Sequence, residues 1–199
     1  VTHFLDWQLW GNVASAHRAV NLALHLLLAT LLFLLVRRML VNPRNSSPSH
    51  LTQADWAAFF ATSLFVLHPL QSFAVSYVSG RGDTLMLLFS VAAALAFQKS
   101  WTLSALMTAL AIGSKESGLL IAPLLVLGSD WVQRQSRTAE SGKSRSLPWF
   151  GYSAIAAIGA LYLLLRLTIL NFVNTLNFYG TSNVLTENPQ YRLYTYLTT

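Results

Sequence analysis

Long apolar segments separated by short polar stretches constrain the fold of this chain more than any other feature. The clearest segment runs from Ala19 to Val36 and is closed by Arg37 and Arg38. About 20 helical residues cross the roughly 30 Å of hydrocarbon in a bilayer. The sequence therefore predicts an all-α fold, a polytopic bundle of transmembrane helices. The predicted membrane segments cover residues 18–36, 56–78, 84–98, 101–113, 117–131 and 148–170.

Composition and charge agree with a membrane protein. Hydrophobic residues make up 54% of the 199 residues and charged residues only 10%, so the chain is more apolar and less charged than a typical soluble domain. The net charge is +6, but the basic residues are divided among short loops and no nucleic-acid motif accompanies them. We therefore expect no nucleic-acid partner. Because cysteine is absent, the sequence predicts no disulfide and no thiolate metal site.

Several features interrupt the apolar segments. The pair His68-Pro69 lies inside segment 56–78, and proline ends or kinks a helix. The segments from 84 to 131 are short for a full crossing, so we expect these helices to tilt or to lean on neighbours. Residues 133–146 contain only polar, charged and small residues and are predicted to form a linker.

The distribution of lysine and arginine predicts an orientation. One set of loops holds eight of them: Arg37, Arg38, Arg44, Lys99, Arg134, Arg137, Lys143 and Arg145. The opposite set holds five: Arg18, Arg81, Lys115, Arg166 and Arg192. The richer set is expected on the cytoplasmic side. The turns at 81–83 and 115–116 then share the non-cytoplasmic side of the membrane.

Charged residues in these two turns are candidates for a binding site. Arg81, Asp83, Lys115 and Glu116 lie between apolar segments, where an ionisable group costs a few kcal/mol and usually faces the bundle interior or a wet cavity. Arg81 offers a forked donor, and Lys115 a point charge, for phosphate or carboxylate. The alternative is purely structural: Arg81 pairs with Asp83 across Gly82, and Lys115 only extends to the interface.

Histidines and an asparagine suggest further polar contacts. His17, Asn21 and His25 recur at every fourth residue and so lie on one face of a helix. Hydrogen bonding between membrane helices explains this stripe, since the spacing does not match zinc-binding helices and we predict no metal. His68, before Pro69, is either a helix end at the interface or part of the site.

Four sequence blocks carry a resemblance to a known family. They are, in order, LDWQLWG with HRAVNLALH, then HPLQSFAVSYVSGRGDTLMLLF, then GSKESGLLIAPLLVL, and finally LYLLLRLTIL with ENPQYRL. The blocks cover nearly the whole chain, and their order and spacing are more specific than any single block. Together they resemble the transmembrane and tetratricopeptide-repeat O-mannosyltransferases and their bacterial relatives. No tetratricopeptide repeat is visible within these residues.

The resemblance implies a type-C glycosyltransferase fold in a multi-pass protein of the bacterial inner membrane or the endoplasmic reticulum membrane. Such an enzyme would move a sugar, expected to be mannose, from a polyprenyl-phosphate donor to a protein hydroxyl on the non-cytoplasmic face. By the same resemblance, Lys115 would hold the donor phosphate and neutralise the charge that develops on it. Arg81, Asp83 and Glu116 would border the donor cavity, and His68 would contribute to it.

By the same resemblance, two acidic residues of the family are not found in these residues. The catalytic acid of such enzymes lies on the first external loop, which is expected upstream of Val1, and Asp6 is not the residue assigned to this role. Relatives carry glutamate where this chain has Phe73, which puts sugar or acceptor specificity, or activity itself, in doubt.

Two other classes of protein remain open. A secondary transporter also places charges in short broken helices, although such folds commonly show repeated halves that this sequence lacks. A non-catalytic membrane anchor of a repeat-containing interaction protein is the third possibility. In the transferase interpretation the partners are membrane lipid, the lipid-linked sugar donor and a protein acceptor.

Overall fold

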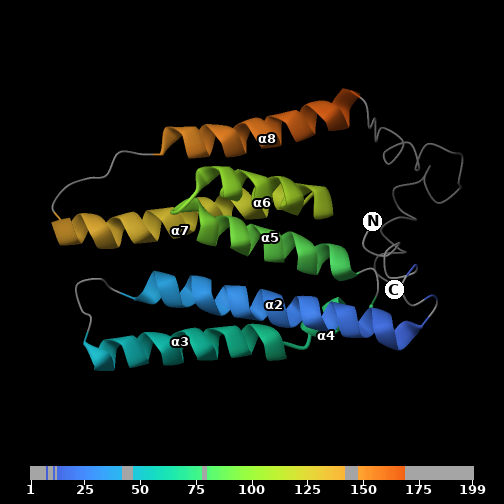
Figure 1. Cartoon of the computed structure of the whole chain (residues 1–199), viewed down its shortest axis with the longest axis horizontal. Helices are drawn as coiled ribbons and strands as arrows, with labels where there is room; N and C mark the ends of the chain where they lie inside the picture. The colour runs from blue at the N-terminus through green and yellow to red at the C-terminus, as the bar shows by residue number, and fades with distance from the viewer. Residues whose placement is uncertain are drawn as a thin grey trace, which may run out of the picture. The chain divides into compact units, whose positions relative to one another are not determined.

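The computed structural model describes residues 8, 11, 13–41, 47–77, 80–141 and 148–168. Within these ranges it contains seven α-helices and no strand (Figure 1), which confirms the predicted all-α fold. The helices are α2 (Ala14–Leu40), α3 (Pro48–Leu67), α4 (Gln71–Ser76), α5 (Arg81–Phe97), α6 (Trp101–Ser114), α7 (Gly118–Ser141) and α8 (Trp149–Thr168). One compact unit extends to Gly159, so it includes the first half of α8, and a second unit begins at Ala160.

The predicted segment 56–78 is two helices rather than one, and it begins earlier than predicted. Ser47 caps α3 by accepting a hydrogen bond from the His50 amide at 3.4 Å, and Pro48 occupies the first turn, where its missing N–H costs nothing. The helix ends before Pro69. There, Nδ1 of His68 accepts a hydrogen bond from the amide of Leu70 at 3.3 Å, and α4 follows.

The predicted linker at 133–146 is wrong over its first part, because α7 continues through Ser141. Residues 133–141 are polar, but they contain neither glycine nor proline and are rich in good helix formers. An ion pair between Asp130 and Arg134, one helical turn apart, supports the continuation. The polarity of these residues does not mark the end of the helix, which continues as a polar extension of an apolar segment.

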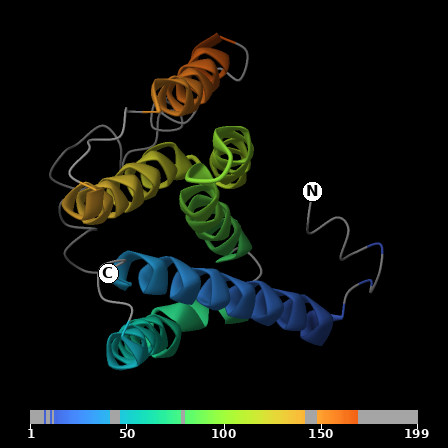
Figure 2. The same cartoon turned by 60° about the vertical axis from the view of Figure 1, so that its left-hand side comes forward.

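The core forms where α5 packs against α2, α6 and α7, and α2 also contacts α3 (Figure 1 and Figure 2). Small side chains on α5 allow this close approach, since Ser90, Ala93 and Ala94 are completely buried. Gly151 brings the start of α8 onto α5: a Cβ there would lie 2.7 Å from the Phe97 ring. The core cluster includes Leu28, Leu35, Leu88, Val91, Val126 and Ile155.

The outer surface of the helices is unusually apolar. Leu64, Leu67 and Phe150 are 74%, 80% and 81% exposed, and many other large apolar side chains of the described helices are exposed as well. Two of the described helices, α2 and α8, are long and apolar enough to cross a bilayer. These features indicate membrane association. That α3, α5, α6 and α7 also cross the membrane stays a prediction.

Gly118 begins α7 where this helix turns back tightly on α6. A Cβ at this position would lie 2.6 Å from the carbonyl oxygen of Ala111, closer than real Cβ atoms approach, so backbone would have to move. We expect Gly118→Ala to lower the free energy of unfolding by about 1–3 kcal/mol. Thermal unfolding in detergent, followed by circular dichroism, measures the change.

Gly128 provides the matched control in the same helix, because nothing lies within 4 Å of a Cβ built there. Gly128→Ala should raise the free energy of unfolding by about 0.5–1 kcal/mol, since alanine is the better helix former. Equal effects of the two substitutions would show that the contact with Ala111 does not limit residue 118.

Candidate functional site

The two charged turns predicted from the sequence meet at one end of the α5–α6 hairpin. Asp83 lies in the first turn of α5, and Lys115 directly follows the last residue of α6. The ammonium group of Lys115 donates a hydrogen bond to Oδ1 of Asp83 in an ion pair. The backbones of the two turns are also close, because a Cβ built on Gly82 would lie 3.5 Å from the carbonyl oxygen of Ser114. Both charged side chains are about half exposed, at 45% for Lys115 and 53% for Asp83.

Arg81 faces α2 rather than this ion pair. It is the first residue of α5 and only 1% exposed. Its Nε donates a hydrogen bond to Oδ1 of Asn21 at 2.8 Å, and its Nη2 donates to the carbonyl oxygen of His17 at 3.4 Å. The predicted structural alternative, in which Arg81 pairs with Asp83 across Gly82, is not what the structure shows. Each of the two residues has a partner from a different part of the chain: Arg81 binds Asn21, and Asp83 binds Lys115.

The polar stripe on α2 holds neighbouring elements in place. The Asn21 amide nitrogen donates to the carbonyl oxygens of Val75 and Tyr77, at 3.4 and 3.2 Å, while its oxygen accepts from Arg81. Asn21 therefore joins α2 to the end of α4 and the start of α5. One turn further along, His25 is buried and stacks on the ring of Phe65 in α3, with 5.9 Å between ring centroids.

The remaining predicted residues occupy different surroundings. Glu116 is exposed in the turn between α6 and α7, next to Lys115. His68 is exposed, and its side-chain hydrogen bond is the local one to Leu70. Asp6, the ENPQYRL block and the side chain of Phe73 lie outside the described residues. Among the described residues, no group of three metal-binding side chains is placed to hold an ion.

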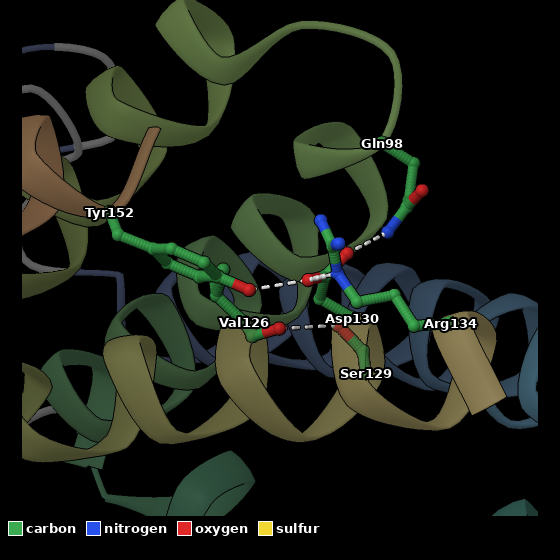
Figure 3. A network of polar contacts seen from close by, with 6 residues as sticks. All are labelled: Gln98, Val126, Ser129, Asp130, Arg134 and Tyr152. Atoms are coloured by element: carbon green, nitrogen blue, oxygen red, sulfur yellow. Dashed lines mark hydrogen bonds and ion pairs between the residues drawn. The ribbon is translucent and has the colours of Figure 1, made fainter. Parts of the chain in front are cut away.

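A second polar cluster, which sequence reasoning missed, surrounds Asp130 (Figure 3). This carboxylate is 1% exposed, and it accepts hydrogen bonds from the Gln98 amide, the Arg134 guanidinium and the Tyr152 hydroxyl. Asp130 and Arg134 belong to α7, Gln98 follows α5 and Tyr152 belongs to the first turn of α8. The cluster therefore ties three helices together.

The Asp130 carboxylate favours the charged form of the neighbouring Arg134 guanidinium. Burial alone would lower the pKa of the Arg134 guanidinium, but the hydrogen bond and negative charge of Asp130 outweigh burial and raise this pKa above its usual value. A sequence signal for the cluster existed. A single acid in the apolar run LLVLGSDWVQR, with arginine four residues later, predicts an ion pair on one helix face.

Arg37 and Arg38 make further polar contacts at the same end of the helices as the Asp130 cluster. Arg37 forms an ion pair with Asp55 of α3, and Arg38 donates to the carbonyl oxygen of Leu95 at 2.8 Å. Lys115 and Asp83 lie at the opposite end of α5. Polar interactions thus gather at the two ends of the bundle, as they do when the middle of each helix is in hydrocarbon.

Apolar side chains dominate the region between these ends, where buried polar residues such as His25 and Ser90 are few. A groove of about 370 Å³ lies between α2 and α3, and its lining includes Ala29, Phe33, Phe59, Thr62 and Val66. This groove offers few polar groups to bind a charged ligand. The exposed pair Lys115–Asp83, with Glu116 beside it, is therefore the candidate site for a charged ligand.

The fold and the charged turns define an all-α, membrane-associated protein with an ionic site at one end of its helices. The chain is similar to protein O-mannosyl-transferase F38B6.6 of Caenorhabditis elegans, with 30% identity over 128 residues. These residues are 63% of this chain and 17% of the nematode protein, so the chain spans about a sixth of that relative. No protein-family model and no solved structure matches the chain. The similarity supports a distant, mannosyltransferase-like relationship.

Proposed function

We propose that this chain is part of a membrane glycosyltransferase of the type-C class, in the family of transmembrane and tetratricopeptide-repeat O-mannosyltransferases. It would transfer mannose from polyprenyl phosphate to a protein hydroxyl on the non-cytoplasmic face. The observation that carries the proposal is the ion pair of Lys115 and Asp83, which joins two turns from separate parts of the sequence at one end of apolar helices. The similarity to a protein named as an O-mannosyltransferase supports it.

The proposed reaction exchanges one bond at the anomeric carbon of the sugar. The acceptor hydroxyl oxygen bonds to this carbon, and the bond from the carbon to the phosphate oxygen breaks. Polyprenyl phosphate leaves with the electron pair, and the hydroxyl proton passes to a general base, a role that we assign to no described residue. A cation beside the phosphate lowers the barrier, because negative charge grows there in the transition state.

The chain supplies this cation through Lys115. Its ammonium group is exposed and flexible, so it can leave Asp83 and bind a phosphate oxygen. In this proposal the carboxylates of Asp83 and Glu116 would accept hydrogen bonds from sugar hydroxyls, and His68 would lie at the border of the site. Arg81 contributes indirectly. Its hydrogen bond to Asn21 fixes the start of α5 and with it the position of Asp83.

The test is a transfer assay with the purified, intact protein in proteoliposomes. We expect mannose to move from polyprenyl-phosphate mannose to serine or threonine of a peptide, and free mannose or the carrier without sugar should give no product. Solute uptake without sugar transfer would favour a transporter. Neither activity, in protein shown to be folded, would favour the membrane anchor.

A further inference from the structure

We infer that Asp83 weakens binding of the spent carrier, polyprenyl phosphate, at the site of Lys115 and so promotes product release. The inference rests on the proposed function and adds a role that opposes binding. In the absence of ligand, Asp83 neutralises Lys115; once a phosphate has taken over Lys115, the same carboxylate repels it. Asp83 is therefore a specificity residue that separates the donor from the product by their charge.

The ion pair is built so that a phosphate can replace the carboxylate. Both side chains are about half exposed, and ion pairs in such surroundings contribute little to stability. Lys115 is thus held in position without being locked. A ligand that enters with a phosphate group needs to displace only this one weak contact.

The Asp83 carboxylate stays close to the site after the exchange. It lies in the first turn of α5, where the helix dipole favours a negative charge without any help from Lys115. Gly82 lies close to the Ser114 carbonyl, since a Cβ built on Gly82 would be 3.5 Å from that oxygen, so the two turns are near each other through their backbones as well. A phosphate bound to Lys115 consequently remains within a few ångströms of the Asp83 carboxylate.

Donor and product differ in the charge that this carboxylate meets. The sugar-linked donor is a phosphodiester with one negative charge, whereas the product is a phosphomonoester with a charge of about −1.5 to −2 at pH 7. Coulomb repulsion grows in proportion to charge. Asp83 therefore repels the product about 1.5 to 2 times as strongly as the donor, which favours release of the product.

Binding to the intact protein, with and without Asp83→Asn, tests the inference. The probes are farnesyl phosphate, a monoester, and farnesyl methyl phosphate, a diester with one charge. Removing one negative charge about 6 Å away in a water-like dielectric should tighten diester binding about threefold. The monoester carries about 1.5 to 2 times the charge, so its binding should tighten more, by about fivefold to tenfold.

Matched variants distinguish a failure of the inference about Asp83 from a failure of the proposed donor site. Asp83→Ser, a second neutral replacement, should give the same pattern, and Asp55→Asn, which removes an exposed acid paired with arginine at the opposite end, should change neither affinity. An equal gain for both probes, or weaker binding, in Asp83→Asn would overturn the inference while leaving the proposed site intact. If Lys115→Ala binds both probes normally, the proposed donor site itself is wrong.

Discussion

Lys115→Ala should reduce binding of polyprenyl-phosphate mannose by about tenfold to a hundredfold and bring sugar transfer to background. Removing the ammonium deletes a charge-assisted hydrogen bond to phosphate, which contributes about this factor. It also leaves Asp83 beside the phosphate without its counter-ion. Both effects act in the same direction. Titration of the intact protein with the labelled donor, followed by the transfer assay, measures them.

Two substitutions make this result specific. Lys99→Ala removes an exposed lysine at the opposite end of α5 and should leave donor binding unchanged. Lys115→Arg keeps the charge and should retain a substantial part of the affinity. Unchanged binding in Lys115→Ala, or an equal loss in Lys99→Ala, would refute the assignment of the donor site to these turns.

Asp130→Ala should be the most destabilising substitution among the polar residues described. The carboxylate is buried and satisfies three donors from three parts of the fold (Figure 3). Its removal deletes the ion pair with Arg134 and the acceptor of the Tyr152 hydroxyl and the Gln98 amide. Breaking a buried pair in this way costs about 3–5 kcal/mol. Thermal unfolding in detergent would show this loss as a large fall in the midpoint temperature.

An exposed ion pair at the same end of the bundle is the control for this effect. Asp55 binds Arg37, and both side chains are nearly half exposed, so Asp55→Ala should cost at most about 1 kcal/mol. Asp130→Asn, which keeps the shape and one acceptor oxygen but loses the charge, should fall between the two. A loss in Asp130→Ala no greater than in Asp55→Ala would show that the buried cluster does not hold α5, α7 and α8 together.

Local sequence was sufficient to predict several helices. The apolar run from Ala19 to Val36 forms most of α2, and the break at Pro69 separates α3 from α4. Such features depend on hydropathy and on the missing N–H of proline, which act within one or two helical turns. The same local reasoning failed for residues 133–141, because their polarity hid a continuing helix.

The candidate site was predicted in part. The sequence predicted that the turns containing Asp83 and Lys115 lie on one side of the membrane, and the structure brings these two turns together. That these residues form a binding site stays a prediction. The partners within the set differ from those considered, since Arg81 binds Asn21 rather than Asp83. Asp130 was overlooked because its donors Gln98 and Tyr152 lie 32 and 22 residues away along the chain.

Which segments are apolar, where the chain turns and which turns carry charge can all be predicted from the sequence, because these properties depend on the transfer of side chains out of water and on backbone chemistry. Which charges neutralise each other depends on the folded arrangement of the helices. Several opposite charges were possible partners for each residue, and the choice depends on how closely helices approach. That approach is set by small contacts such as Gly118 on Ala111, whose geometry no local pattern encodes.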